Sequence, residues 1–325
     1  MEQVNSYGWK AVLGSALGYA MDGFDLLILG FMLTAISGDL GLTTAEAGSL
    51  VTWTLVGAVI GGLIFGALSD KFGRVRVLTW TIVLFAVFTG LCAFAQGYWD
   101  LLVYRTIAGI GLGGEFGIGM ALAAEAWPAK HRAKATSYVA IGWQLGVLAA
   151  ALLTPALLPH IGWRGMFLVG IIPALVAWVM RARLHEPEVF VKHAEEEAKL
   201  SALDSFKLLV KDKATFKISL GIAILTSVQN FGYYGIMIWL PNFLSKQLGF
   251  SLTKSGLWTA VTICGMLLGI WIFGRLADRI GRKPTFIIFQ IGAVISILVY
   301  SQLTDPDTML VAGALLGMFV NGMMG

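Results

Sequence analysis

The chain has 325 residues, of which 57% are hydrophobic and only 13% are charged, and its mean hydropathy is +0.79. A soluble domain has about 25% charged residues, so this composition excludes an ordinary soluble protein and indicates a chain that crosses a membrane many times. The net charge of +4 does not indicate a nucleic-acid partner, because the basic residues follow a membrane topology instead.

Ten apolar runs are long enough to cross a bilayer, since a spanning helix needs about 20 residues. Six precede a charged stretch and four follow it. The runs centre on 11–36, 47–69, 76–96, 99–126, 135–158, 163–182, 215–243, 253–276, 284–302 and 307–325. We expect an all-α, polytopic membrane protein with a six-helix bundle in residues 1–180 and an incomplete bundle of about four helices in residues 215–325. The stretch 181–214 is expected to be a solvated cytoplasmic linker, or alternatively a lipid-binding or regulatory segment.

The first span contains two acidic residues, Asp22 and Asp25, three positions apart. This spacing places them at adjacent positions on one helix face, and Asp22 lies about 16 Å into the helix, near mid-membrane. Two carboxylates so close together do not both ionise easily, so both are candidates for proton coupling. Alternatively, one pairs with a buried cation and the other only hydrogen-bonds to a neighbouring helix.

A short charged turn follows the second span and reads GALSDKFGRVR over residues 66–76. Gly73 suits a tight turn, and Gly66 is expected to allow close packing of the helix end. Asp70, beside Arg74, can accept hydrogen bonds from arginine and from a helix N-terminus, and so act as a latch at the membrane surface. The alternative is that these charges only fix the topology.

The fourth span contains a ridge of small residues and one carboxylate, Glu115. The ridge recurs every fourth position and suits close helix contact; it consists of Gly109, Gly113 and Gly117. Glu115 lies on about the opposite face. Because exposure of a carboxylate to lipid is costly, we expect Glu115 to face a central cavity and take part in proton coupling.

Arg105 is the one basic residue within a span. The sequence allows two roles for this residue. It forms an ion pair with Asp22 or Asp25 that holds the first bundle together, or it binds a substrate carboxylate and tunes the aspartate pair.

Further polar residues lie at membrane depth and are candidates for substrate binding, although such a residue more often forms an interhelical hydrogen bond than binds a ligand. They are Gln144 in the fifth span, Gln229, Asn230, Tyr233 and Tyr234 in the seventh, and Asn321 in the tenth.

The charged turn occurs a second time, at residues 274–284, as GRLADRIGRKP. Its Gly, Leu, Asp, Gly and Arg match those of the first turn in register, 208 residues later. The matching gate residues are Gly274, Asp278, Gly281 and Arg282. A repeat at this distance implies two homologous halves.

The shared pattern, G-x-L-x-D-[KR]-x-G-R, resembles the signature loop of the major facilitator superfamily of secondary transporters. The stretch Glu125 to Arg132 resembles a second motif of that family, E-x-x-P-x-x-x-R. The resemblance implies two six-helix halves that rock about a site lined by the first, fourth, seventh and tenth helices. It also implies that Asp70 faces an eleventh helix and that Asp278 faces the fifth.

Three segments of the first half resemble the sialate:proton and aromatic acid:proton symporter branches of this superfamily. They are the Asp-Gly-Phe-Asp sequence of the first span, residues 105–119, and Gly162 to Phe167. The fifth span lacks the Gly-Pro pair typical of the antiporters, which favours symport. Members have twelve helices, so this chain is expected to lack the last two.

The distribution of lysine and arginine predicts the orientation, because these residues accumulate on the cytoplasmic side. With the N-terminus inside, 19 of the 23 basic residues are cytoplasmic. We therefore expect a multi-pass protein of the plasma membrane, the inner membrane in a bacterium.

Together these features predict secondary transport of a small organic anion by proton symport. The expected partners are the anion, protons and the lipid bilayer, and the protein is expected to be a monomer. No phosphate loop, nucleophile triad or metal-ligand spacing occurs in the sequence, so we expect no cofactor, no metal and no enzymatic activity. The alternative is a non-transporting sensor or scaffold, or an inactive truncated transporter.

Overall fold

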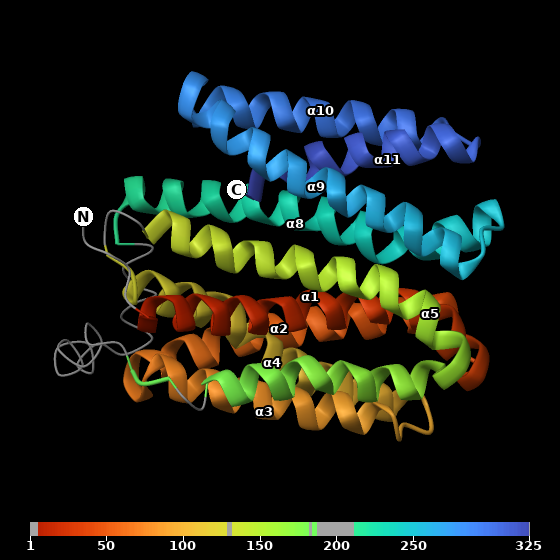
Figure 1. The fold of residues 1–325 in the computed structure, drawn as a ribbon, viewed down its shortest axis with the longest axis horizontal. Helices are drawn as coiled ribbons and strands as arrows, with labels where there is room; N and C mark the ends of the chain where they lie inside the picture. Colours follow the sequence, from red (N-terminus) through yellow and green to blue (C-terminus); the bar gives the residue numbers. More distant parts are fainter. Residues whose placement is uncertain (1–5, 129–131, 182–183, 187–210, 325) are drawn as a thin grey trace. The chain divides into compact units, whose positions relative to one another are not determined.

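The protein is described by a computed structural model that covers residues 6–128, 132–181, 184–186 and 211–324 (Figure 1). All regular secondary structure in these ranges is helical, as the sequence predicts. The first part of the chain comprises α1 (Ser6–Leu40), α2 (Thr44–Phe72), α3 (Arg74–Cys92), α4 (Tyr98–Glu125) and α5 (Arg132–Arg181). The second comprises α8 (Lys213–Leu248), α9 (Leu252–Ile280), α10 (Arg282–Gln302), α11 (Pro306–Asn321) and the 3₁₀ turn η2 (Gly322–Met324).

Helix α5 is two helices joined at a kink. Gly162 has φ 66° and ψ 176°, which is not helical, and this backbone region favours glycine. The two parts correspond to the fifth and sixth predicted spans. Counted in this way, the described residues contain ten α-helices, in agreement with the sequence.

Seven helices of the described residues are long and apolar enough to cross a membrane, and α11 is a shorter apolar helix. One of the seven, residues 138–179 of α5, contains two predicted spans. Helix α8 is outside this set, because Gln229 and Asn230 interrupt its apolar run.

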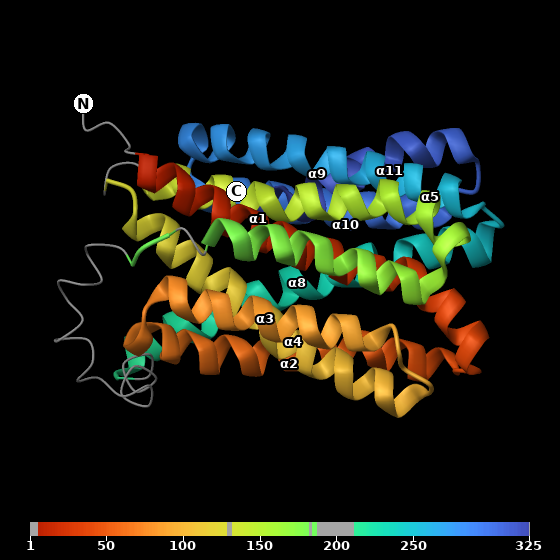
Figure 2. The same cartoon turned by 60° about the horizontal axis from the view of Figure 1, so that its bottom comes forward.

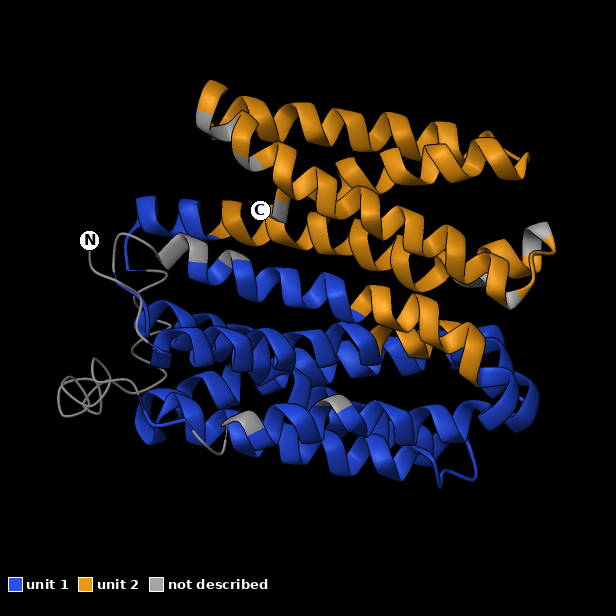
Figure 3. Cartoon of the chain, in the orientation of Figure 1, with its two compact units in different colours: residues 1–25, 32–146, 158–219 blue, residues 26–31, 147–157, 220–325 orange. Residues whose placement is uncertain are grey.

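The chain forms two compact units (Figure 3). Unit 1 comprises residues 1–25, 32–146 and 158–219, and unit 2 comprises residues 26–31, 147–157 and 220–325. The predicted linker lies mostly outside the described residues, and the predicted domain boundaries stay a prediction.

Glycines place the helices of each unit in close contact. In unit 1, α2, α3 and α4 pack against one another (Figure 2), and a Cβ at Gly61 would lie 1.9 Å from the carbonyl oxygen of Ile110. In unit 2, α9 packs on α11, and a Cβ at Gly269 would lie 2.2 Å from the carbonyl oxygen of Met318. These pairs are 208 residues apart, so the repeat seen in the two turns extends to the helix packing.

The predicted glycine ridge of α4 is only partly a packing surface. Gly109 and Gly113 lie against the backbone of α2 as expected. A Cβ at Gly117, however, would meet nothing within 4 Å among the described residues, so the expected contact at that position is wrong.

Candidate functional site

The central feature of unit 1 is a buried ion pair between Arg105 of α4 and Asp25 of α1. The guanidinium donates two hydrogen bonds to the carboxylate, at 3.0 and 2.7 Å, and both side chains have no solvent exposure. Arg105 also donates through Nε to the Thr54 hydroxyl at 3.3 Å. The structure thus identifies Asp25 as the partner of Arg105, where the sequence left Asp22 and Asp25 open. With these hydrogen bonds in place, Arg105 is not available to bind a substrate.

Because this pair is buried, its loss is expected to affect both stability and function. An arginine–carboxylate fork is a strong, directional interaction, and away from water neither charge has another way to be solvated. Removal of one partner therefore leaves an uncompensated charge. Any event that neutralises Asp25 would change the position or the partner of Arg105.

Asp22 lies one helical turn before Asp25 and is also buried, with 3% of its surface exposed. The neighbouring Tyr19 ring stands between two other rings, 5.1 Å from that of Phe116 on α4 and 4.9 Å from that of Trp143 on α5. The Phe116 ring is 51% exposed. An aromatic surface therefore lies beside the acidic face of α1.

Glu115 does not occupy the position that the sequence analysis assigned to it. Its side chain is buried, and it accepts a hydrogen bond of 2.7 Å from the Thr81 hydroxyl of α3. A Cβ at Gly111, about one turn before Glu115, would lie 2.8 Å from the carbonyl oxygen of Thr81, so this face of α4 packs on α3. The expectation that Glu115 faces a cavity is corrected accordingly.

At one end of unit 1, Arg74 joins the ends of three helices. It forms an ion pair with Asp70 at the end of α2 and a 3.1 Å contact with Glu125, the last residue of α4. It also donates to the Ser69 hydroxyl at 2.9 Å. The turn itself depends on Gly73, whose φ of 103° favours glycine. Four of the predicted gate residues thus lie together.

The remaining gate residues have different outcomes. A Cβ at Gly66 would meet nothing within 4 Å among the described residues, so the expected close packing there is wrong. Gly281 has φ 92°, in agreement with a second tight turn. The side-chain surroundings of Arg132, Gly274, Asp278 and Arg282 lie outside the described part of the chain.

Glu186 also belongs to this end of unit 1, and the sequence analysis did not identify it. Its carboxylate accepts hydrogen bonds from the backbone N–H groups of Val75 and Arg76, at 3.2 and 3.1 Å. It therefore caps the N-terminus of α3, which favours negative charge. Glu186 lies 110 positions after Arg76 and beyond the end of α5. Helical periodicity therefore does not mark it, and no sequence signal identifies this role.

Replacement of Glu186 by Ala is expected to lower the free energy of unfolding by about 0.5–2 kcal/mol, the usual effect of losing a helix cap. Thermal unfolding of the detergent-solubilised protein measures this change. Glu186→Gln retains an acceptor oxygen and should lose less. Equal losses for the two variants would contradict the capping role.

Of the polar residues predicted in α8, Gln229 forms a hydrogen bond to another helix, and the contacts given for the others lie within α8. Gln229 donates from Nε2 to the carbonyl oxygen of Val320 at 2.6 Å, and Asn230 donates to the carbonyl of Thr226 in its own helix at 2.9 Å. The Tyr233 and Tyr234 rings lie 5.3 Å apart in an edge-to-face arrangement. These contacts support the interhelical reading for Gln229.

Two further candidates are buried polar side chains, Gln144 of α5 and Asn321 at the end of α11, exposed by 2% and 3%. The Gln144 Oε1 atom has no hydrogen-bond partner among the described residues. Gln144 lies about opposite the face of α5 on which Gly142 and Gly146 contact α1. A role of Gln144 in substrate binding stays a prediction.

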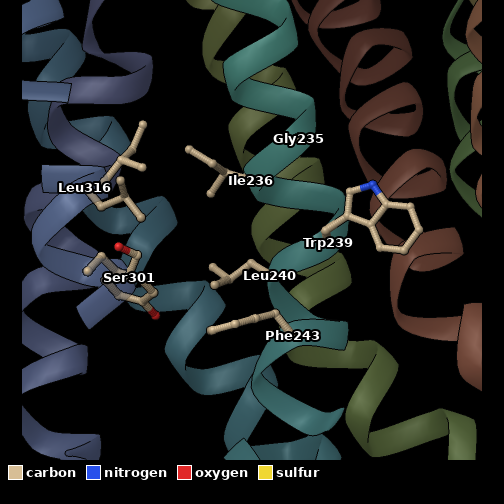
Figure 4. A pocket seen from close by; sticks show the side chains of 9 residues that line it. Gly235, Ile236, Trp239, Leu240, Phe243, Ser301 and Leu316 are labelled. Atoms are coloured by element: carbon tan, nitrogen blue, oxygen red, sulfur yellow. The ribbon is translucent and has the colours of Figure 1, made fainter. Parts of the chain in front are cut away.

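Unit 2 contains a cavity of about 250 Å³ between α8, α10 and α11 (Figure 4). Its lining includes Trp239, Phe243 and Leu316, and its polar side chains are Ser301 and Tyr300. No charged side chain lines it. We therefore do not assign an anion site to this cavity.

Comparison with known proteins places this architecture in a family. The sequence profile described as Major Facilitator Superfamily matches residues 15–325. The chain belongs to the major facilitator superfamily. It is accordingly a multi-pass integral membrane transporter and not an enzyme.

Several superfamily relatives are similar over most of their length. A protein of Haemophilus influenzae that carries a metabolite-transport name is 80% identical, over 99% of this chain and 80% of its own. A cis,cis-muconate transport protein of Acinetobacter baylyi is 32% identical, over 95% and 76%. A sialic acid transporter of Escherichia coli is 31% identical, over 98% and 78%. These names agree with the branches that the sequence motifs resemble.

Solved structures support the superfamily fold. A D-xylose–proton symporter has a TM-score of 0.76 at 23% identity, covering 98% of this chain and 80% of its own. An Escherichia coli xylose transporter in a partially occluded, inward-open state has a TM-score of 0.74 at 20% identity, covering 98% and 84%. At these identities the likeness concerns the fold alone.

Proposed function

We propose that this superfamily member transports a small organic anion together with protons, and that the Arg105–Asp25 pair couples the two. The observation that carries the proposal is the complete burial of this pair within membrane-spanning helices. Ionisable groups at such depth are costly and belong to transport pathways in many membrane proteins. Asp22, one turn away, is proposed to exchange the proton with Asp25.

The proposed coupling follows from charge balance. A proton on Asp25 removes the negative charge that holds Arg105, while the guanidinium cannot lose its own proton. Arg105 then requires another anion, and a substrate carboxylate offers the same two-oxygen geometry. The proton and the anion thereby favour each other's binding, which is the basis of symport.

The substrate class is supported by the relatives and by the aromatic surface on unit 1. Muconate and sialic acid, named for two relatives, are both carboxylates. The rings of Phe116 and Tyr19 are suited to stacking against a planar, unsaturated acid, with the buried Trp143 ring packed behind Tyr19. Glu115, which accepts a hydrogen bond from Thr81, remains a proposed proton-coupling residue beside Asp22 and Asp25.

The remaining parts of the proposal concern topology. We propose a cytoplasmic N-terminus and a location in the plasma membrane, the inner membrane in a bacterium, on the basis of the lysine and arginine distribution. The Arg74 cluster then lies at the cytoplasmic end, where Asp70 and Asp278 would act as latches. We propose a monomer as the transporting species.

Uptake by proteoliposomes under an imposed inward proton gradient tests the proposal. We expect accumulation of at least one member of a panel of aromatic, unsaturated, sialic and short-chain carboxylic acids. Asp22→Asn is expected to abolish gradient-driven accumulation, because an amide carries no exchangeable acidic proton. The matched control is Asp307→Asn, a change at an exposed carboxylate of α11.

Each contrary result has a defined meaning. Uptake that is indifferent to the gradient for every acid contradicts proton coupling. Full accumulation by Asp22→Asn removes Asp22 from the proton pathway. Specific binding without flux would instead favour a sensor.

A further inference from the structure

The segment Gly162 to Phe167 of unit 1 carries two aromatic side chains, Trp163 and Phe167, and forms an aromatic arm. The break of α5 at Gly162 is followed by a helix on which Trp163 and Phe167 lie one turn apart. Their ring centroids are 6.0 Å apart at an interplanar angle of 88°, and both side chains are buried. This edge-to-face geometry is favourable for aromatic pairs, so the two rings support each other.

The inner end of this arm covers Arg105. The guanidinium carbon lies 5.7 Å from the centroid of the Phe167 ring, within the range of a cation–π interaction. Asp25 occupies two N–H groups of the same guanidinium, and Thr54 occupies Nε. Arg105 is thus held by a carboxylate, a hydroxyl and the face of a ring.

The other end of the arm is fixed by a polar cluster. The Trp163 indole N–H donates to the Asp39 carboxylate at 3.1 Å. Arg164 forms an ion pair with Asp39, lies 4.0 Å above the Trp163 ring and donates to the carbonyl oxygen of Ala95 at 3.1 Å. Asp39 belongs to α1, and Ala95 follows α3. Contacts outside the Arg105–Asp25 pair therefore fix the orientation of Trp163, and through it that of Phe167.

We propose that Phe167, aimed by Trp163, is a positioning residue that keeps Arg105 in place while the charge of Asp25 changes. This inference rests on the proposed proton coupling. When a proton neutralises Asp25, the fork loses its anion, but the attraction between the ring and the cation is unaffected. The Thr54 hydrogen bond, at 3.3 Å, is at the long end of the normal range, and the Cys92 thiol of α3, which also interacts with the guanidinium, is only a weak acceptor. The ring is therefore the strongest of the partners that do not depend on the proton of Asp25.

The first test is Phe167→Leu, which removes the π-system and keeps an apolar side chain. We expect the maximal rate of gradient-driven uptake to fall about fivefold to thirtyfold, as for loss of a desolvated cation–π contact. The KM should rise as well, because Arg105 is also the proposed ligand of the substrate carboxylate and would be less well placed to bind it. Phe167→Trp should restore most of the rate. The matched control is Phe85→Leu, a fully buried phenylalanine of unit 1 that packs on Gly111.

A graded replacement separates the π-system from shape. Fluorinated phenylalanines at position 167 keep the ring while progressively weakening its negative face. We expect the uptake rate to decrease steadily with fluorination. A flat series, with wild-type uptake intact, would overturn the positioning role and leave the proposed symport untouched.

A second readout does not require transport. Arg105 Nε–H should give a slowly exchanging NMR signal in nitrogen-15-arginine-labelled protein, assigned by its loss in Arg105→Lys. Asp25→Asn imitates the protonated carboxyl, so the signal is compared in that background. We expect slow water exchange in Asp25→Asn alone and rapid exchange when Phe167→Leu is added, whereas adding Phe85→Leu should leave it slow. If the signal stays slow in Asp25→Asn with Phe167→Leu, the ring does not hold Arg105 and the inference fails, whether or not a substrate is known.

Discussion

Replacement of Asp25 by Ala is expected to lower the free energy of unfolding by about 3–5 kcal/mol, the usual cost of stranding one partner of a buried ion pair. Arg105 has no exposure to water, and Thr54 offers it only one acceptor. The guanidinium would therefore remain charged in an apolar surrounding. The loss of two charge-assisted hydrogen bonds accounts for the size of the effect.

A double-mutant cycle measures the pair itself. Arg105→Met strands the carboxylate, which can take up a proton, and this substitution should therefore cost less than Asp25→Ala. Asp25→Ala with Arg105→Met removes both charges and should cost much less than the sum of the single changes. All three variants should lose gradient-driven uptake. Asp307→Ala, at an exposed carboxylate of α11, is the control. Additive losses in the cycle would mean that the two side chains do not interact.

Helix positions and the repeat could be predicted because they depend on properties of short windows. The length of each apolar run defines a membrane span, and the recurring charged turn marks equivalent helix connections in the two halves. Gly73 and Gly281 have positive φ because a tight turn between antiparallel helices requires it. The repeat also explains why glycines 208 residues apart pack in the same way.

The partners of the charged residues could be predicted only in part. Asp22 and Asp25 differ by one turn, and the choice of Arg105 between them depends on the relative height of α1 and α4. The sequence analysis placed Glu115 on a cavity because a helical wheel gives only the angle of a side chain around its helix, not what packs there. In the structure α4 packs against both α2 and α3, and Glu115 bonds to α3. Arg105 also needed Phe167, which comes from a helix beyond the Gly162 break, and no local pattern reveals that contact.

The second large effect is expected at Gly61, where α2 meets α4. A Cβ there would lie 1.9 Å from the carbonyl oxygen of Ile110 and 2.7 Å from its carbonyl carbon. These are backbone atoms and cannot rotate away, so Gly61→Ala must separate the helices. We expect a loss of about 1–3 kcal/mol or more in the free energy of unfolding, the cost of overpacking.

The intrinsic helix preference acts in the opposite direction, because alanine is favoured over glycine by about 1 kcal/mol in a helix. Gly117→Ala measures that term alone, since nothing described lies within 4 Å of its added Cβ, and this variant should be neutral or more stable. Thermal unfolding of the variants in detergent separates the two contributions.

Gly269→Ala is the equivalent substitution in unit 2, because its Cβ would lie 2.2 Å from the carbonyl oxygen of Met318. A loss similar to that of Gly61→Ala would mean that the repeat preserves the energetics of helix packing as well as its geometry. If Gly61→Ala and Gly117→Ala are equally stable, α2 and α4 are not in close contact. The frame that brings Arg105 of α4 to Asp25 of α1 would then need another explanation.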